Sequence, residues 1–270
     1  MSLILVAGFL LGTLQHYCHQ TLAAADTSYP VTPPAGKVSI IIPAYNEELY
    51  IERTLQCILA QNVIQQYSEM FEIIVVDNES QDRTGEVARQ YATVITAPRG
   101  KLNAKNAGAS AASGDILVFV DADGTMDPNW LNLLIRHFHD PNVVAVGGAV
   151  HEQKDVLQTI IETQLITIEG YFANVLCGSN QAVRKEAFFA IGGFPVYGDQ
   201  FDRVFLREAE EVGFCLRLKQ VGKVVFDTQA TAYFSARSLR CHQCQHSSES
   251  TECSYCTNTS LKPEIMFGRG

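Results

Sequence analysis

Apolar runs of strand length alternate with segments of helical periodicity over roughly the first 150 residues, and this alternation restricts the fold more than any other feature. The predicted strands are 38–42, 71–76, 93–96, 116–120 and 143–150. The predicted helices are 47–61, 82–91, 102–113 and 128–138. Such an alternation is typical of an α/β fold, a mostly parallel central sheet with helices on both faces. The second half is less regular, with helices predicted at 156–175, 182–189 and 206–221 and short strands at 223–227 and 230–234.

Polar side chains directly follow several of the predicted strands. Asn46, Asp77 and Asp121 share this placement, and ligands bind outside the carboxyl ends of the strands in sheets of this kind. Asp121 and Asp123 stand one residue apart behind the apolar run 116–120. Mg²⁺ and Mn²⁺ prefer oxygen ligands and often use one or two carboxylates together with substrate phosphates. These residues alone leave two interpretations open, a metal and phosphate site or an Asp-rich turn that ends the strand.

Composition excludes some classes of protein. With 47% hydrophobic and 18% charged residues, the chain has enough apolar side chains for a packed core, so disorder over most of its length is not expected. The formal net charge of −9 argues against binding to a nucleic-acid backbone, which needs a clustered positive surface. A nucleotide ligand remains compatible with this charge, because backbone amides and a metal ion can hold it.

The N-terminus, residues 1–25, is apolar from Leu3 to Leu14 and has no Lys or Arg before that run. The run is shorter than the ~20 residues of a membrane-spanning helix. We predict a marginal membrane anchor or interfacial helix, with a cleaved signal peptide or a buried helix as alternatives. Residues 26–36 contain three prolines and are predicted to form a linker. These features predict a membrane-associated protein whose main domain lies in the cytosol, and secretory or lumenal placement is the alternative.

Seven short segments occur in an order that resembles the family 2 inverting glycosyltransferases. They are IIIPAYNE (40–47), VVDNESQDRT (75–84), GKLNAKNAG (100–108), VDAD (120–123), GSN (178–180), GGF (192–194) and EEVGFCLRL (210–218). The resemblance covers residues 37–237 and implies a GT-A fold, a Rossmann-like sheet with a nucleotide-binding half (37–125) and an acceptor-binding half (126–237). It implies transfer of a hexosyl group from a UDP- or GDP-sugar to a glycan or lipid-linked acceptor.

The resemblance also implies which residues bind the donor. They are Pro43, Ala44, Tyr45, Glu47, Asp77, Lys101, Asn106, Asp121, Ala122 and Asp123. Asp77 is expected to read the nucleotide base, and the N–H groups of the turn at 43–47 to face the diphosphate. Asp121 and Asp123 are the expected Mn²⁺ or Mg²⁺ ligands, with Asp121 also near the ribose. A divalent cation would neutralise the charge that develops on the departing nucleoside diphosphate.

Inversion needs a base that takes the proton of the acceptor hydroxyl, and the resemblance assigns the matching pair to Glu210 and Glu211. Glu211 is the candidate base, although the family has Asp there, so Asp199 and Asp202 are held in reserve. An acidic first helical turn is the alternative explanation of this pair. A second departure is Phe234, where many relatives have a metal- or leaving-group-binding His. The acceptor side is expected to comprise Gly178, Ser179, Asn180, Gly192, Gly193 and Phe194, although the glycines also suit a structural turn.

The C-terminal tail, residues 238–270, contains two pairs of cysteines, Cys241 with Cys244 and Cys253 with Cys256. Two thiolate pairs of this spacing predict a structural Zn²⁺ site, and two disulfides are the alternative in an oxidising compartment. The sequence shows no apolar spans after residue 237, which favours a non-processive enzyme. A second reading of the chain is a catalytically degenerate protein that binds nucleotide-sugars or glycans and docks a partner through its Cys-rich tail.

Overall fold

A twisted sheet forms the centre of the domain. Its parallel strands β1, β2 and β4 end at the same edge of the sheet. The computed structural model describes residues 30–153, 176, 178–195 and 203–235. Within these residues eight strands pair in the order β3-β2-β1-β4-β7-β6-β8-β5. Their bounds are β1 Val38–Ala44, β2 Phe71–Asp77, β3 Thr93–Thr96, β4 Ile116–Val120, β5 Thr125–Met126, β6 Val143–Gln153, β7 Asn180–Arg184 and β8 Lys223–Ser235.

The first half of the sheet is parallel. β1 pairs with β2 and β4, and β2 pairs with β3, all in parallel register. β7 and β5 run against their neighbours, whereas β6 and β8 are parallel to one another. β1 extends two residues beyond the predicted strand and contains Pro43. The β4 register ends at Ile41, so the missing N–H of Pro43 removes no hydrogen bond on that side.

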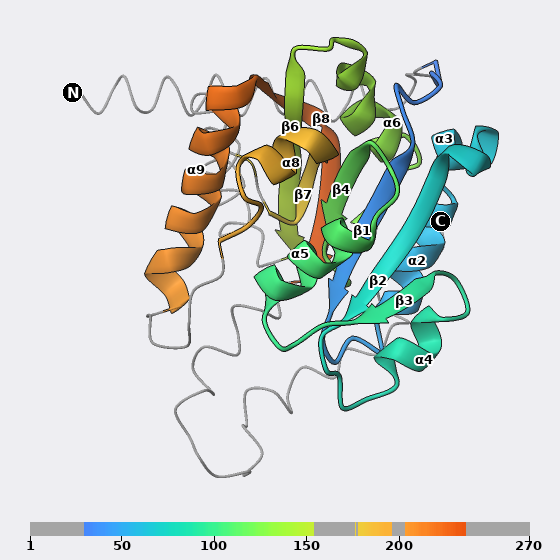
Figure 1. Ribbon diagram of the computed structural model, residues 1–270. Helices are drawn as coiled ribbons and strands as arrows, with labels where there is room; N and C mark the ends of the chain where they lie inside the picture. Colours follow the sequence, from blue (N-terminus) through green and yellow to red (C-terminus); the bar gives the residue numbers. More distant parts are fainter. Residues whose placement is uncertain (1–29, 154–175, 177, 196–202, 236–270) are drawn as a thin grey trace, which may run out of the picture. The chain divides into compact units, whose positions relative to one another are not determined.

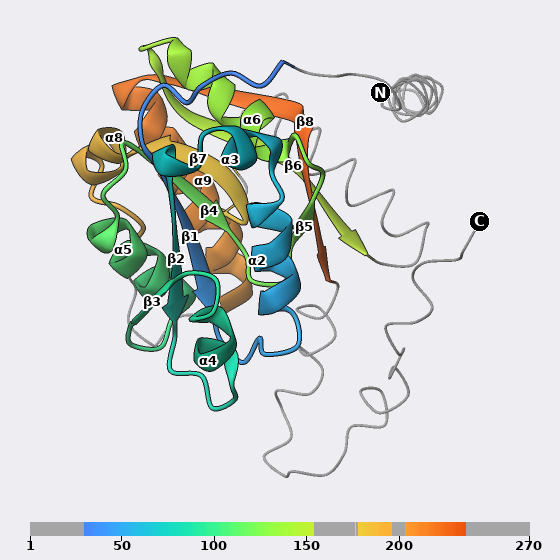
Figure 2. The same cartoon turned by 90° about the vertical axis from the view of Figure 1, so that its right-hand side faces the viewer.

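Helices cover both faces of the sheet (Figures 1 and 2). One face carries α5, α8 and α9, and the other carries α2, α3 and α6, while α4 packs against α2 and β2. The bounds are α2 Ile51–Leu59, α3 Asn62–Gln66, α4 Thr84–Ala88, α5 Lys101–Ala111, α6 Trp130–Ile135, α8 Lys185–Ala190 and α9 Arg203–Val221. This two-sided covering explains why β1 and β4 are apolar at almost every position, because both of their faces are buried.

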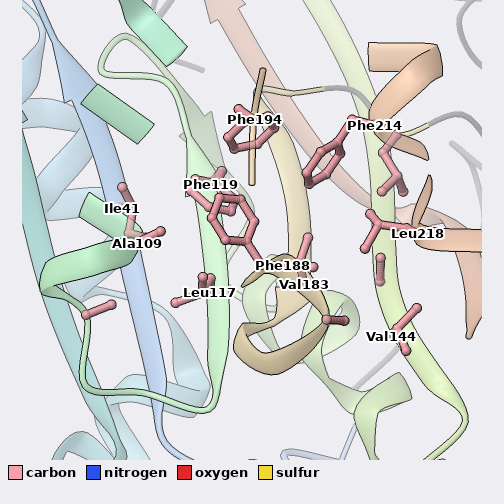
Figure 3. Close-up of a cluster of buried hydrophobic side chains, with 14 of the residues drawn as sticks. Ile41, Ala109, Leu117, Phe119, Val144, Val183, Phe188, Phe194, Phe214 and Leu218 are labelled. Carbon is pink, nitrogen blue, oxygen red and sulfur yellow. The ribbon is translucent and has the colours of Figure 1, made fainter. Parts of the chain in front are cut away.

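A cluster of four phenylalanines fills the space between the sheet and helices α8 and α9 (Figure 3). Phe194 stacks on Phe214 with ring centroids 4.3 Å apart, and its other neighbours are Phe119 and Phe188 at 5.1 and 5.3 Å. All four rings are buried. Because Phe119 belongs to β4 and Phe214 to α9, the cluster fastens α9 to the strand that precedes Asp121.

The structure confirms the α/β fold class and corrects two local predictions. Residues 182–189 were predicted as one helix, but Asn180–Arg184 is a strand inserted between β4 and β6, and α8 begins only at Lys185. The two short strands at 223–227 and 230–234 are one strand, β8, with an irregularity opposite Gly148–Val150. The predicted helix 156–175, the apolar segment 1–25 and the tail 238–270 lie outside the described residues. Among the described helices, none is long and apolar enough to cross a membrane.

Candidate donor and acceptor site

The carboxyl ends of β1, β2 and β4 meet at one edge of the sheet, as predicted. The register places Ala44 beside Asp77, and Asp77 beside Thr96 at the end of β3. Ile41 is level with Phe119, so the loop that begins at Asp121 lies at the same edge. The predicted donor residues after these strands are therefore brought together, although they are far apart in sequence.

The loops after β1 and β2 are interlocked by hydrogen bonds that run in both directions. The backbone N–H groups of Asn46, Glu47 and Glu48 donate to Ser80 Oγ, Thr84 Oγ1 and Asp82 Oδ2 at 3.1, 2.7 and 3.2 Å. In return, the N–H of Gln81 donates to Asn46 Oδ1 at 2.8 Å and that of Arg83 to Glu48 Oε2 at 3.0 Å.

This interlock corrects part of one expectation. The N–H groups of the turn at 43–47 were expected to face a diphosphate, but side chains of the second loop already accept the hydrogen bonds of Asn46 and Glu47, and that of the adjacent Glu48. Burial alone would raise the pKa of Asp82, but the hydrogen bonds from Thr84 and from the Glu48 amide hold that pKa below its usual range. Asp82 is therefore a carboxylate that holds the two loops together.

Asp77, the expected base-reading residue, is held at the end of β2 by its own loop. Its Oδ1 accepts the N–H of Ser80 at 3.0 Å. A Cβ on Gly85 would approach Asp77 Oδ2 to 2.6 Å, so the side chain needs a glycine at this place. Asn46 and Glu79 both have positive φ, 54° and 60°, which marks the two loops as tight turns.

Lys101 and Asp121 form an ion pair across the site. Lys101 Nζ lies 2.7 Å from Asp121 Oδ2, and the Asp121 side chain is 19% exposed against 45% for Lys101. Lys101 begins α5, directly after Gly100, whose φ of +132° suits glycine. Close by in sequence, the Arg99 guanidinium lies 4.6 Å from the ring centre of Tyr45. Two cationic side chains thus stand at an edge that is expected to bind a polyanion.

The loop that carries Asp123 is held from beneath by α2. The Thr54 hydroxyl is fully buried and lies 2.8 Å from the Ala122 carbonyl and 2.9 Å from that of Gly124. Phe234 of β8 packs on the other side, because a Cβ on Gly124 would come within 2.6 Å of its ring. Phe234, the position for which the family resemblance implies a His, therefore lies next to this loop.

The carboxylates of Asp121 and Asp123 fit a metal ion whose remaining ligands come from the phosphates of the substrate. In the described part of the chain, no group of three or more His, Cys, Asp and Glu side chains is close enough to hold a metal ion. Mg²⁺ and Mn²⁺ nevertheless bind through one or two carboxylates plus substrate phosphates. Asp121 and Asp123 supply that number.

Asn106 was expected to line the donor site, but the structure gives its amide another partner. Asn106 Nδ2 donates to the Phe194 carbonyl at 2.9 Å, and the Phe194 N–H donates to Asn106 Oδ1 at 3.0 Å. Gly192 and Gly193, of the expected acceptor side, have φ of +81° and +69°, so glycine is required by the backbone there.

Asn180 also differs from its expected role. It is completely buried, its Oδ1 accepts the indole N–H of Trp130 at 2.9 Å, and its Nδ2 donates to the carbonyls of Ala149 and Ala230 at 2.8 and 2.9 Å. The side chain thus joins α6 to β6, β7 and β8, in place of the expected acceptor contact. Gly178 and Ser179 precede β7, and Lys105 donates from α5 to the Gly178 carbonyl.

Glu210 and Glu211 lie within α9, of which the structure describes the backbone here and not these side chains. Asp199, Asp202 and the four tail cysteines lie outside the described residues. Sequence reasoning missed Thr54, Thr84, Asp82 and Arg99. Asp82 and Thr84 lie inside the motif VVDNESQDRT, so their place in that motif could have indicated a role at the site. Thr54 lies in an amphipathic helix, and nothing in the sequence distinguishes it from the other residues of that helix.

The comparisons with known proteins agree with this geometry. The model of glycosyl transferase family 2 matches residues 39–203, more than half of the chain. The chain belongs to glycosyl transferase family 2. Glycosyltransferase AglE of Haloferax volcanii is 36% identical over 121 residues, 42% of this chain and 39% of that protein. The glucosyl-dolichyl phosphate glucuronosyltransferase of the same organism is 27% identical over 222 residues, 72% of this chain and 67% of that protein.

Solved structures of glycosyltransferases share the fold of this chain. A mannosyltransferase from Pyrobaculum calidifontis, solved with GDP-Man and Mn²⁺, has a TM-score of 0.60 at 20% identity, covering 90% of this chain and 72% of the other. S. aureus TarS 1–349 with UDP-GlcNAc has a TM-score of 0.56 at 18% identity, covering 74% and 59%. The fold is GT-A. The match spans only about two fifths of the length of AglE and of the Bacillus subtilis relative YdaM.

Proposed function

We propose that this chain transfers a hexosyl group from a nucleoside-diphosphate sugar to an acceptor hydroxyl, with inversion and with help from a divalent metal. The observation that carries the proposal is the Lys101–Asp121 ion pair, with Asp123 two residues later on the same loop and Asp77 at the same edge of the sheet. Two solved structures of this fold hold GDP-Man with Mn²⁺ and UDP-GlcNAc. The proposed donor is thus a GDP- or UDP-sugar.

The donor half supplies binding and orientation. Asp77 would accept hydrogen bonds from the nucleotide base, and Tyr45 would contact the base from the interlocked loop. Lys101 and Arg99 would face the phosphates, because the amides of residues 46–48 are already bonded within the protein. Asp123, with Asp121, would hold Mn²⁺ or Mg²⁺, which when bound neutralises charge on the departing diphosphate.

The acceptor half would supply the base. Glu211, on α9, would take the proton of the acceptor hydroxyl as that oxygen attacks the anomeric carbon on the face opposite the phosphate. Such an attack inverts the anomeric centre, through a transition state of oxocarbenium character. Glu210 would orient Glu211, and Gly178, Ser179 and Gly192 to Phe194 would shape the acceptor side.

A lipid-linked or glycan acceptor is proposed, since one relative is named for action on a dolichyl phosphate sugar. Membrane association through residues 1–25 and a cytosolic domain belong to the same proposal. Transfer of single sugars without processive elongation stays a prediction, and the length of the product tests it.

The experiment is a donor screen with the full chain in mild detergent. A panel of UDP- and GDP-sugars is incubated with Mn²⁺ or Mg²⁺ and a dolichyl or polyprenyl phosphate acceptor, and nucleoside diphosphate release is measured. Turnover with one donor, abolished in Asp123→Ala and unchanged in the remote surface variant Gln65→Ala, supports the proposal. No turnover with any donor contradicts it.

A second candidate function is nucleotide-sugar binding without turnover. The ring of Phe234 beside the Asp123 loop favours it, because the family resemblance implies an imidazole at this position. Metal-dependent binding of one donor, with no release of nucleoside diphosphate in the presence of acceptor, would favour this second candidate.

A further inference from the structure

The side chain of Asn106 makes a two-point contact with the backbone of Phe194. Its Nδ2 donates to the Phe194 carbonyl at 2.9 Å, while its Oδ1 accepts the Phe194 N–H at 3.0 Å. The amide of Asn106 therefore satisfies both backbone groups of a buried residue 88 positions away. A Cβ on Gly193 would lie 2.9 Å from the same Oδ1, so the glycine lets the loop come this close.

The loop held by Asn106 in turn holds α9. The Phe194 ring stacks on Phe214 of α9 at 4.3 Å with an interplanar angle of 22° (Figure 3). Arg217, one turn further along the helix, donates from Nη2 to the Gly193 carbonyl at 3.2 Å. α9 is thus fastened to the loop by an aromatic stack and by a hydrogen bond on the same side.

The fastened turn of α9 is the one that directly follows the glutamate pair. Phe214 comes three residues after Glu211, which is less than one helical turn of 3.6 residues. At the other end of this chain of contacts, α5 begins with Lys101, whose ammonium pairs with Asp121. Lys105, the neighbour of Asn106, donates to Gly178 and lies 5.3 Å from the centre of the Phe194 ring. Helix α5 therefore contacts Asp121, Gly178 and Phe194, one residue in each of three separate loops.

We propose that Asn106 is a positioning residue, and not a donor ligand. Through Phe194 it sets α9, and with it the base Glu211, at the correct distance from the donor held at the Asp121 loop. This inference rests on the proposed function, because the role of Glu211 as the base is part of that proposal. It predicts that loss of the Asn106 amide separates catalysis from donor binding: the donor still binds, but the base is misplaced. A misplacement of about 1 Å suffices to lower a rate by up to ~100-fold.

The test compares Asn106→Ala with Ser110→Ala in the full chain. Ser110 is an exposed residue of the same helix, and its hydroxyl donates only to a carbonyl of the preceding turn. Binding of nucleoside diphosphate with Mn²⁺ is measured by calorimetry, and kcat and donor KM are measured with the best donor of the screen. For Asn106→Ala we expect kcat to fall at least tenfold and Kd to stay within twofold, whereas Ser110→Ala matches the wild type in both.

Arg217→Gln provides a second perturbation from the α9 side, for the case that Asn106→Ala does not fold. It removes the guanidinium contact to Gly193 and leaves α5 intact, and we expect the same fall in kcat with an unchanged Kd. A Kd raised tenfold in Asn106→Ala with kcat retained would make Asn106 a donor ligand and overturn the inference alone. Unchanged kcat in both variants would overturn it too. A wild type that turns over no donor would instead refute the proposed function on which the inference rests.

Discussion

Thr54→Val tests whether α2 holds the loop that carries Asp123. The Thr54 side chain is completely buried, and its hydroxyl lies 2.8 and 2.9 Å from the carbonyls of Ala122 and Gly124. Valine has almost the same shape but donates no hydrogen bond. The substitution therefore removes the single O–H donor that is within hydrogen-bond distance of both carbonyls, on either side of Asp123, and an unsatisfied buried group costs about 1–3 kcal/mol.

We expect Thr54→Val to lower the free energy of unfolding by about 2 kcal/mol. In a domain of this size, such a loss corresponds to a fall in Tm of roughly 4–8 °C. Because the substitution loosens the loop that carries Asp123, the proposed metal ligand, the Mn²⁺ concentration for half-maximal nucleoside diphosphate release should rise, by roughly tenfold. The measurements are urea unfolding followed by circular dichroism, and a metal titration of donor hydrolysis.

Thr54→Ser is the matched control. It keeps the hydroxyl and removes one buried methyl group, which costs about 1 kcal/mol, so it should lose stability but keep the metal dependence of the wild type. If Thr54→Val lost stability but kept the wild-type metal dependence, Thr54 would support the fold without positioning the Asp123 loop. If it lost neither, the buried hydrogen bonds would contribute nothing and the reasoning would be refuted.

Three further results are expected. Thr84→Val removes the hydroxyl that accepts the Glu47 N–H, so the affinity for nucleoside diphosphate should fall roughly five- to tenfold by calorimetry, an effect of about 1 kcal/mol; an unchanged affinity would show that the interlock does not organise the base site. Gly193→Ala should lower stability more than Gly192→Ala, because both have positive φ but only Gly193 is crowded by Asn106, and equal losses in urea unfolding would contradict this. Asp227, 5% exposed and bonded to Arg136 and His137, keeps a lowered pKa against the opposing effect of burial. Because this pKa is lower in the folded state, Asp227 stabilises the fold at pH values above its unfolded-state pKa of about 3.9, and this stabilisation is lost as the pH falls through the folded-state pKa. Asp227→Asn should therefore weaken the loss of stability at acidic pH. An unchanged loss would assign the effect to other carboxylates.

The central strands β1 and β4 were predictable because they are buried on both faces. β1 is apolar except at Ser39, β4 is apolar throughout, and each is followed by polar residues, so both their existence and the edge that carries the candidate site followed from the sequence. β7 was missed for a physical reason. The stretch Asn180–Arg184 is a strand only because β4 and β6 flank it, and those partners lie far away in sequence.

The site was predictable in its position but not in its internal bonding. The chain order of the strands placed Asp77 and Asp121 at one edge, and the structure confirms that placement. The hydrogen bonds donated by the backbone N–H groups of residues 46–48 could not be predicted, because their acceptors lie in a loop 34 to 37 residues later. The same is true of Asn106, whose partner Phe194 belongs to the other half of the domain.

The most direct test of this account is nucleoside diphosphate release by the full chain, with Mn²⁺, a lipid phosphate acceptor and each of the UDP- and GDP-sugars in turn. The account predicts release from one donor, its loss in both Asp123→Ala and Glu211→Gln, and retained donor binding in Glu211→Gln. Metal-dependent donor binding without release from any donor would contradict an enzymatic role for the site.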